Sequence, residues 1–283
     1  MKTVTFTKRA IQVLVGTLAV AASFSALASP VVTQWGFTVN SGFSAWTDSN
    51  NSAAGITASN NNALVSGFLG SPAPSLLSWG GAAGFGKSSL GVGAATNGYF
   101  SDTLTTNAAA VNTVKVIHNN VPVFDPSLTA ATLYDVIQLQ ALTPGPDAPF
   151  FVPALSFGIK FKETPNSGIC AVAASPTPCN DIFVLDVAGA GFAADNTLQQ
   201  FFGYNGNGYY AVLSIAGLSV LEDSACAAAG AASGCRGLTT VEGLSNEFQV
   251  KLAINGVPEP ETLALFGIAL VGMSIVRRRK NAA

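Results

Sequence analysis

The sequence predicts an all-β protein: a single β-sandwich or jelly-roll-like domain, flanked by an N-terminal signal peptide and a C-terminal transmembrane helix. Three observations lead to this prediction. Apolar and polar residues alternate with a period of two in several segments of the 283-residue chain. Turn-forming residues separate those segments, and outside the two ends no segment carries a sustained helical stripe with caps. A body of this length can bury a sizeable core in one domain.

The clearest strand signal is Phe157–Lys162, which places three apolar side chains on one face and two lysines on the other. Glu247–Asn255 alternates in the same way. Asp181–Val187 is apolar on both faces, which is typical of a more central strand. The other predicted strands are Val114–Val116, Gln199–Tyr204 and Tyr209–Val220, with the last two joined by the hairpin turn Asn205–Gly208.

The N-terminal part of the predicted domain gives a weaker strand pattern. Thr47–Asn62 is polar and rich in turn residues, and Ser71–Gly98 is rich in Gly, Ala and Ser. These two stretches predict a looser organisation than the rest of the body.

The N-terminal segment 1–28 has the three parts of a secretory signal peptide. A basic start precedes an apolar run, and the run ends in the small-x-small pattern that a signal peptidase accepts. The apolar run is short for a membrane span, which favours cleavage over anchoring. The residues at the predicted cleavage site are Ala26, Ala28 and Ser29.

The C-terminal segment predicts a membrane-spanning tail. Thr262–Val276 is apolar, and a basic block follows it at once: Arg277, Arg278, Arg279 and Lys280. About fifteen helical residues rise roughly 22 Å, which spans a bilayer core when the flanking side chains snorkel. The positive-inside rule keeps the basic block in the cytoplasm, so the body faces the other side. The chain therefore divides into a signal peptide (1–28), a β-rich extracellular domain (29–256) and a tail (257–283).

The charge of the body argues against nucleic acid as a partner. The whole chain has a formal net charge of −2, but between residues 29 and 257 thirteen acidic residues face six basic ones, a net charge of −7. A body without a basic patch cannot neutralise phosphates.

The four cysteines form two pairs with equal spacing, Cys170 with Cys179 and Cys226 with Cys235. In an oxidising compartment this spacing favours two local disulfides, although four cysteines allow three connectivities. Each loop of this size contributes about 2–3 kcal/mol in the chain-entropy account. A structural zinc site needs closer cysteine pairs or nearby histidines, so we expect no metal site.

Two features resemble functional sites, a phosphate-binding loop and a catalytic histidine, but the surrounding sequence argues against both. Gly81–Ser88 fits a phosphate-binding loop, but the glycines that follow it argue against the helix that such a loop requires. His118 is the single histidine, and no G-x-S-x-G nucleophile elbow accompanies it. We expect His118 to end a strand, with the turn Asn119–Pro122 after it. The acidic residues are scattered singly, so we expect no enzyme activity and no cofactor.

Two further sets of residues could bind ligands. Asp48–Asn51 and Asp195–Asn196 could supply oxygens to calcium, although turns in solvent explain them better. The aromatic candidates for sugar stacking are Trp35, Trp46, Trp79, Tyr209 and Tyr210. In a β-rich domain such rings more often pack in the core.

Val257-Pro258-Glu259-Pro260, followed by the apolar run and the basic block, resembles the PEP-CTERM sorting signal. The resemblance covers about the last twenty-five residues. It implies processing by an exosortase, a membrane protease-transferase, in a Gram-negative-type bacterium that makes extracellular polysaccharide. The two prolines keep the motif extended, which suits a protease cleft.

A second resemblance concerns the body. Ile117–Pro122 is similar to the Thr-His-x-Asn segment of a PEP-CTERM subgroup, and Gly237–Glu242 and Phe248–Ile254 also resemble that group. His118 and Asn120 match the motif, whereas Ile117 stands where the group has threonine. The resemblance implies no assigned activity.

These observations predict an exported protein with a structural role in exopolysaccharide, biofilm or aggregate formation. A carbohydrate-binding surface module is the alternative, and a hydrolase is the third class. The expected partners are signal peptidase and exosortase during processing, and extracellular polysaccharide is a further candidate. The precursor is expected in the inner membrane, and the processed body at the cell surface or in the extracellular matrix.

Overall fold

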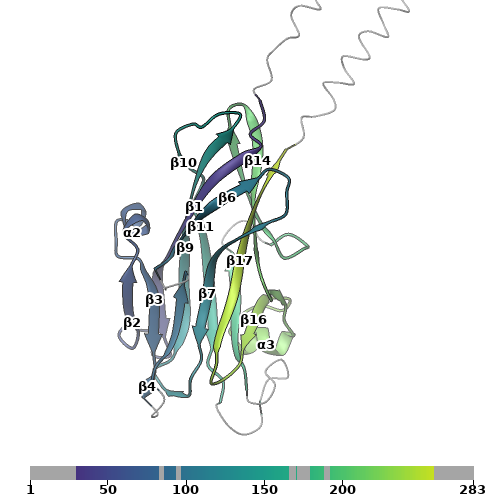
Figure 1. Cartoon of the computed structure of the whole chain (residues 1–283). Helices are drawn as coiled ribbons and strands as arrows, with labels where there is room; N and C mark the ends of the chain where they lie inside the picture. Colours follow the sequence, from purple (N-terminus) through teal and green to yellow (C-terminus); the bar gives the residue numbers. More distant parts are fainter. Residues whose placement is uncertain are drawn as a thin grey trace, which may run out of the picture.

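The prediction of a β-sandwich is confirmed. A computed structural model describes residues 30–82, 86–93, 97–165, 170, 179–187 and 192–257. Two curled, antiparallel sheets pack face to face over most of this length (Figure 1). The predicted signal peptide and the tail from Pro258 onward lie outside the described residues.

The first sheet has eight strands in the order β15-β16-β12-β11-β9-β1-β6, with β10 paired to β9. Its centre is the long pair β1 and β9, and β1 bulges between Phe43 and Ala45. The strands are β1 (Gln34–Asp48), β6 (Tyr99–Thr105), β9 (Leu128–Thr143), β10 (Phe150–Phe151), β11 (Leu155–Lys162), β12 (Asp181–Val187), β15 (Ser219–Val220) and β16 (Arg236–Thr240).

The second sheet has seven strands in the order β13-β14-β17-β7-β5-β3-β2. They are β2 (Thr57–Asn61), β3 (Pro74–Trp79), β5 (Ser88–Val92), β7 (Val111–Asn119), β13 (Leu198–Tyr204), β14 (Asn207–Ile215) and β17 (Ser245–Gly256). A two-stranded ladder joins β4 (Gly81–Ala82) to β8 (Val123–Phe124). Two short helices, α2 (Ala63–Leu69) and α3 (Asp223–Ala228), lie beside the sheets. The Asn62 side chain caps α2 by accepting from the amides of Leu64 and Val65.

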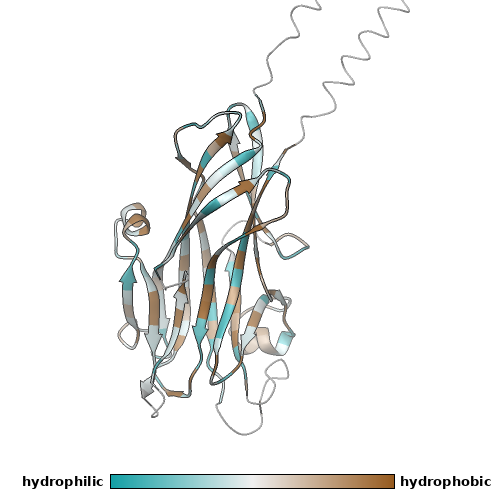
Figure 2. Cartoon of the chain, in the orientation of Figure 1, coloured by the Kyte–Doolittle hydropathy of each residue, from teal (hydrophilic) through white to brown (hydrophobic). Residues whose placement is uncertain are grey.

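The core lies between the two sheets and follows the period-two pattern. Phe157, Ile159 and Phe161 are buried, and the residues between them are more exposed. Along β17, Val250, Leu252 and Ile254 are buried as the alternation predicts. In Figure 2 hydrophobic and hydrophilic residues alternate along many of the strands. Burial of the inner faces is the main force holding the sheets together.

Both ends of the described chain lie at one end of the sandwich, which we call the tail end (Figure 1). There the Val32 amide donates to the Tyr209 hydroxyl at 2.9 Å, and the Val257 amide donates to the Gly208 carbonyl at 2.9 Å. We call the opposite end the distal end. At the distal end β7, β11 and β16 finish and β12 begins.

Most of the predicted strands are confirmed. The prediction of one strand over Tyr209–Val220 is wrong, because β14 ends at Ile215 and Gly217 turns the chain with a φ of 83°. Ser219–Val220 then pairs in the other sheet. The N-terminal part of the domain also has more regular secondary structure than predicted, because it contains β2, α2, β3 and β5.

The structure joins Cys170 to Cys179 and Cys226 to Cys235, with Cα–Cα distances of 5.2 and 5.7 Å. These are the local pairs that the equal spacing favours. The second disulfide links α3 to the start of β16. Within the described residues, no helix is long and apolar enough to cross a membrane. The predicted transmembrane segment Thr262–Val276 lies outside that part of the chain.

Candidate functional site

The junction with the predicted sorting motif is Val257, which follows β17 directly. Its side chain is partly exposed, and its amide still bonds to Gly208. The other residues predicted from the two ends lie outside the described residues: Pro258, Glu259, Pro260, Arg277, Arg278, Arg279, Lys280, Ala26, Ala28 and Ser29.

His118 lies in β7 at the distal end and is completely buried. Its Nδ1 and the Thr240 hydroxyl are 2.9 Å apart. The imidazole stacks on Trp79 at 5.6 Å and meets Phe161 and Phe183 edge-on at 5.4 and 4.9 Å. Burial lowers the pKa of His118 to about 3, so the ring is neutral at physiological pH. The position next to the end of a strand agrees with the sequence prediction.

Asn120 is also completely buried and lies just beyond β7. Its side-chain amide donates to the Thr240 carbonyl at 3.3 Å. Its side chain also lies close enough to Asp181 and Glu242 to lower the pKa of each carboxylate, against the larger effect of burial. Thr240 thus joins the two segments that carry the subgroup resemblance, because both His118 and Asn120 contact it.

Three acidic side chains gather beside Asn120, and we call Glu163, Asp181 and Glu242 the carboxylate cluster. One oxygen of each lies within 4.8 Å of the others. Glu163 follows β11, Asp181 begins β12, and Glu242 lies two residues beyond β16. The sheet register brings these strand ends together, because Lys162 pairs with Ile182 and Asp181 pairs with Thr240.

Burial sets the electrostatics of the carboxylate cluster. Desolvation, followed by the charge of Asp181, raises the pKa of Glu163 to about 9. Desolvation raises the pKa of Asp181 to about 7, although the Thr164 amide donates to its Oδ1 at 2.8 Å. Desolvation also raises the pKa of Glu242. The Trp79 indole donates to Glu163 Oε2 at 3.3 Å. Such a group of acids can hold protons or a cation.

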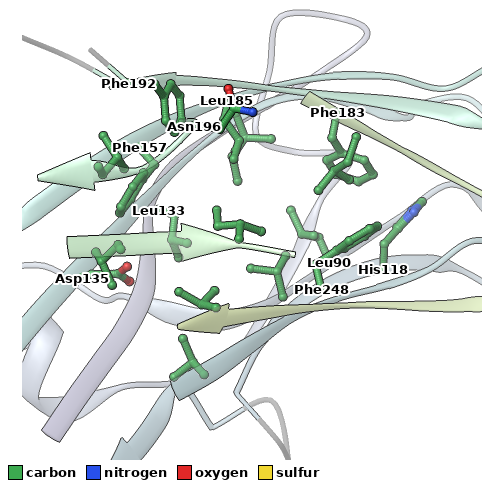
Figure 3. A pocket seen from close by; sticks show the side chains of 18 residues that line it. Leu90, His118, Leu133, Asp135, Phe157, Phe183, Leu185, Phe192, Asn196 and Phe248 are labelled. Carbon is green, nitrogen blue, oxygen red and sulfur yellow. The ribbon is translucent and has the colours of Figure 1, made fainter. Parts of the chain in front are cut away.

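A second feature is an apolar cavity of about 50 Å³ between the two sheets (Figure 3). Aliphatic and aromatic side chains form nearly all of its wall, including Phe157, Phe183 and Phe248. His118 and Asp135 lie at different sides of this wall. The volume is far below the several hundred cubic ångströms of an ordinary ligand pocket, so we assign it to imperfect packing.

Asp135 lies in β9 and is buried beside this cavity. Desolvation raises its pKa from 3.8 to about 6, and a contact with the Ser41 side chain offsets part of the rise. Between pH 4 and 6 the folded chain therefore retains a proton that the unfolded chain has lost. The free energy of unfolding falls as the pH rises through this range, by up to about 3 kcal/mol.

We predict that Asp135→Asn removes this loss and stabilises the protein at pH 7.5 by up to about 3 kcal/mol, because the amide carries no charge to desolvate. Urea unfolding of both proteins from pH 4 to 8 measures the effect as the difference between the two profiles. Asp186→Asn, at an exposed position of β12, is the control and should leave the profile unchanged. Parallel profiles for wild type and Asp135→Asn would contradict the assignment.

The other sequence candidates have structural roles. Asp48 organises its loop, because its carboxylate accepts from the amides of Asn50, Ser52 and Gly55 at 2.9–3.0 Å. Asp195 accepts from the Thr197 amide and hydroxyl. In the phosphate-loop match, Ser88 begins strand β5 where the motif requires a helix.

Most of the aromatic candidates for sugar binding belong to the core. Trp35, Trp79 and Tyr209 are completely buried, and Trp46 is half-buried. Only Tyr210 of the five is exposed, and it packs edge-on against Phe201 at 5.5 Å. Most of these rings therefore pack in the core, which is the more frequent role of aromatic residues in a β-rich domain.

The carboxylate cluster was not predicted from the sequence. Its three acids are far apart in the chain, and no spacing pattern links them. The available signal was their position, since Glu163 directly follows one predicted strand and Asp181 begins another. Without the strand order, that signal could not show that the strand ends are neighbours.

In a comparison with known families, the model of the PEP-CTERM protein-sorting motif matches residues 256–280. The matched segment includes the Pro-Glu-Pro sequence, the apolar run and the basic block, and it does not extend to the His118 segment. A search of curated proteins gave no match. The motif and the two disulfides together indicate that the chain is a PEP-CTERM domain-containing protein, exported and processed by an exosortase.

Proposed function

We propose that this protein is a structural component of the cell surface or extracellular matrix, and that it builds exopolysaccharide-associated or biofilm aggregates by pairing at a sheet edge. Signal peptidase and exosortase act on the precursor at the inner membrane. The processed body then acts outside the cell as a non-enzymatic building unit.

The observation that carries the proposal is the edge strand β13. Among the described strands it ends the seven-stranded sheet, and its sequence LQQFFGY contains no charged residue and no proline. Natural proteins usually protect such an edge with lysine, proline or a bulge. Uncharged six- or seven-residue segments with high β-propensity are also the segments that pair between chains. Phe201 on this strand is 51% exposed, which adds apolar surface to the open edge.

The environment of His118 supports a non-enzymatic role. A general base must reach the proton that it abstracts. His118 is closed off between aromatic rings and holds a hydroxyl of the same chain. The carbohydrate-binding alternative retains few aromatic candidates, since three of its five rings are buried.

Self-association of the purified full-length protein tests the proposal, in a mild detergent that keeps the apolar tail in solution. We expect concentration-dependent assembly by sedimentation velocity and light scattering. Phe201→Lys should reduce assembly at least tenfold at equal concentration, because a desolvated lysine at a paired edge is costly. Phe124→Lys is the matched control, since Phe124 is 66% exposed but lies on β8, outside that sheet.

Two results would contradict the proposal. One is a wild-type protein that stays monomeric at every concentration. The other is equal assembly of both lysine variants. Co-sedimentation with the host's extracellular polysaccharide separates the alternative, because saturable binding competed by one sugar would favour the carbohydrate-binding module.

A further inference from the structure

We propose that the carboxylate cluster at the distal end is a Ca²⁺ site, formed by Glu163, Asp181 and Glu242, and that Ca²⁺ there ties together three neighbouring strand ends. This inference is independent of the β13 edge on which the proposed function rests.

Oxygen ligands from three strand ends converge at the carboxylate cluster. The three carboxylates come from the ends of β11, β12 and β16, which are adjacent in one sheet. One oxygen of each lies within 4.8 Å of the others. Oxygen ligands of Ca²⁺ lie at 2.3–2.6 Å from the ion, so two ligands of one ion are at most about 5 Å apart. The observed spacing therefore suits a single shared ion.

Buried oxygens of Asp181 and Glu163 lack partners. Asp181 is completely buried, and its Oδ2 has no hydrogen-bond partner. Oε1 of Glu163 is also buried without a hydrogen-bond partner. Buried polar atoms are nearly always satisfied in folded proteins, so these two oxygens point to a ligand.

Glu163 and Asp181 have no basic partner in the described part of the chain. Among the described residues the one ion pair joins Lys115 to Glu247, on the surface. No lysine or arginine of that part of the chain therefore forms an ion pair with Glu163 or Asp181. A divalent cation supplies the missing positive charge, as bound cations commonly do among clustered acids.

The chemistry of the ligands selects a hard cation. The cluster offers carboxylate oxygens, which are ligands of Ca²⁺ and Mg²⁺ rather than of zinc or copper. Ligands brought in from three separate strand ends suit Ca²⁺ better, because Ca²⁺ accepts flexible geometry, whereas Mg²⁺ demands near-octahedral geometry and retains its waters. An exported protein also meets Ca²⁺ at the concentrations at which extracellular modules bind it, with Kd values of about 10⁻⁴–10⁻³ M.

Thermal unfolding of the purified full-length protein tests the site, first stripped with EDTA and then titrated with CaCl₂ or MgCl₂. We expect Ca²⁺ to raise Tm by several degrees and to saturate in the millimolar range, because a ligand of the folded state stabilises it by mass action. Mg²⁺ should act more weakly. Calorimetric titration with CaCl₂ should give a stoichiometry of one ion per chain.

Glu163→Gln is the decisive variant. Glutamine cannot supply the carboxylate ligand, so the Ca²⁺ response should fall at least tenfold in affinity. The Tm without Ca²⁺ should change little near pH 7, since the raised pKa already keeps Glu163 protonated and neutral there. Asp181→Asn should show the same loss of affinity and serves if Glu163→Gln folds poorly. Asp186→Asn on the same strand is the control and should keep the wild-type response.

A wild-type Tm that does not change up to 10 mM CaCl₂ would overturn the proposal, and the raised pKa values would then mean that protons alone neutralise the group. A full Ca²⁺ response in both Glu163→Gln and Asp181→Asn would overturn it as well. Neither result would affect the test of strand-edge assembly, because β13 lies in the other sheet and adding EDTA to that test removes any effect of Ca²⁺.

Discussion

Replacing Pro258-Glu259-Pro260 with three alanines is expected to stop processing, so that the protein accumulates in the membrane fraction at its uncleaved size. The motif belongs to the matched sorting signal at residues 256–280. Proline disfavours the helix interior and biases the residue before it toward an extended backbone, so we expect the protease to require an extended motif. Alanine is the strongest helix former, so the replacement favours a helix where the protease needs an extended chain. Cell fractionation followed by immunoblotting measures the released and retained fractions.

Glu261→Ala is the matched control, because it changes the next residue and leaves the Pro-Glu-Pro sequence intact. It should be released like the wild type. Release of the triple-alanine variant at the wild-type size and amount would show that another signal directs processing.

Trp35→Ala is expected to have the largest effect on stability, a loss of about 3–5 kcal/mol in the free energy of unfolding. Trp35 is completely buried at the tail end. Four aromatic rings surround it edge-on, those of Phe150, Phe202, Tyr204 and Tyr209, with centroid distances of 5.2–6.1 Å. Its indole N–H donates to the Thr106 hydroxyl at 2.9 Å. Alanine leaves a large cavity between the sheets and removes these contacts.

Urea unfolding measures this loss as a lower transition midpoint at an unchanged slope. Trp46→Ala provides the comparison, because Trp46 is half-buried and contacts the core from its margin. Its loss should be clearly smaller. Equal losses for the two variants would mean that the ring cluster around Trp35 contributes little beyond ordinary surface burial.

The sequence predicted the strands whose own pattern is strong. Asp181–Val187 matches β12 residue for residue, and the turn after Tyr204 is closed by Asn205 and Gly206 at φ values of 48° and 77°. Both signals are local: an apolar run in one case and residues that tolerate positive φ in the other. For the same reason Cys226 and Cys235 could be paired from their spacing.

The central strands β1 and β9 were harder to predict, because they form through pairing with neighbouring strands more than through the pattern of their own residues. β1 contains Gly36 and Gly42, and its bulge after Phe43 interrupts the alternation. Gly42 is required there, since a side chain would meet the Ala73 carbonyl oxygen at 2.8 Å. Such a strand is stabilised by pairing along its whole length rather than by propensity.

The carboxylate cluster shows the same limit more sharply. Asp181 can be read from the sequence as the start of a strand, but nothing local shows that Glu242 lies beside it. That neighbourhood depends on the pairing of β12 with β16, whose partners are more than fifty residues apart. Only the folded sheet supplies it.

The position of β17 has a mechanical consequence. The strand leads into the sorting tail and lies inside its sheet, hydrogen-bonded to β14 on one side and to β7 on the other. A pull on Val257 is directed along the strand, whereas the ladder bonds run across it. The load is therefore shared among many bonds in shear, and they must fail together rather than peel one at a time. A body tethered through this strand would resist flow and cell movement far better than one held by an edge strand.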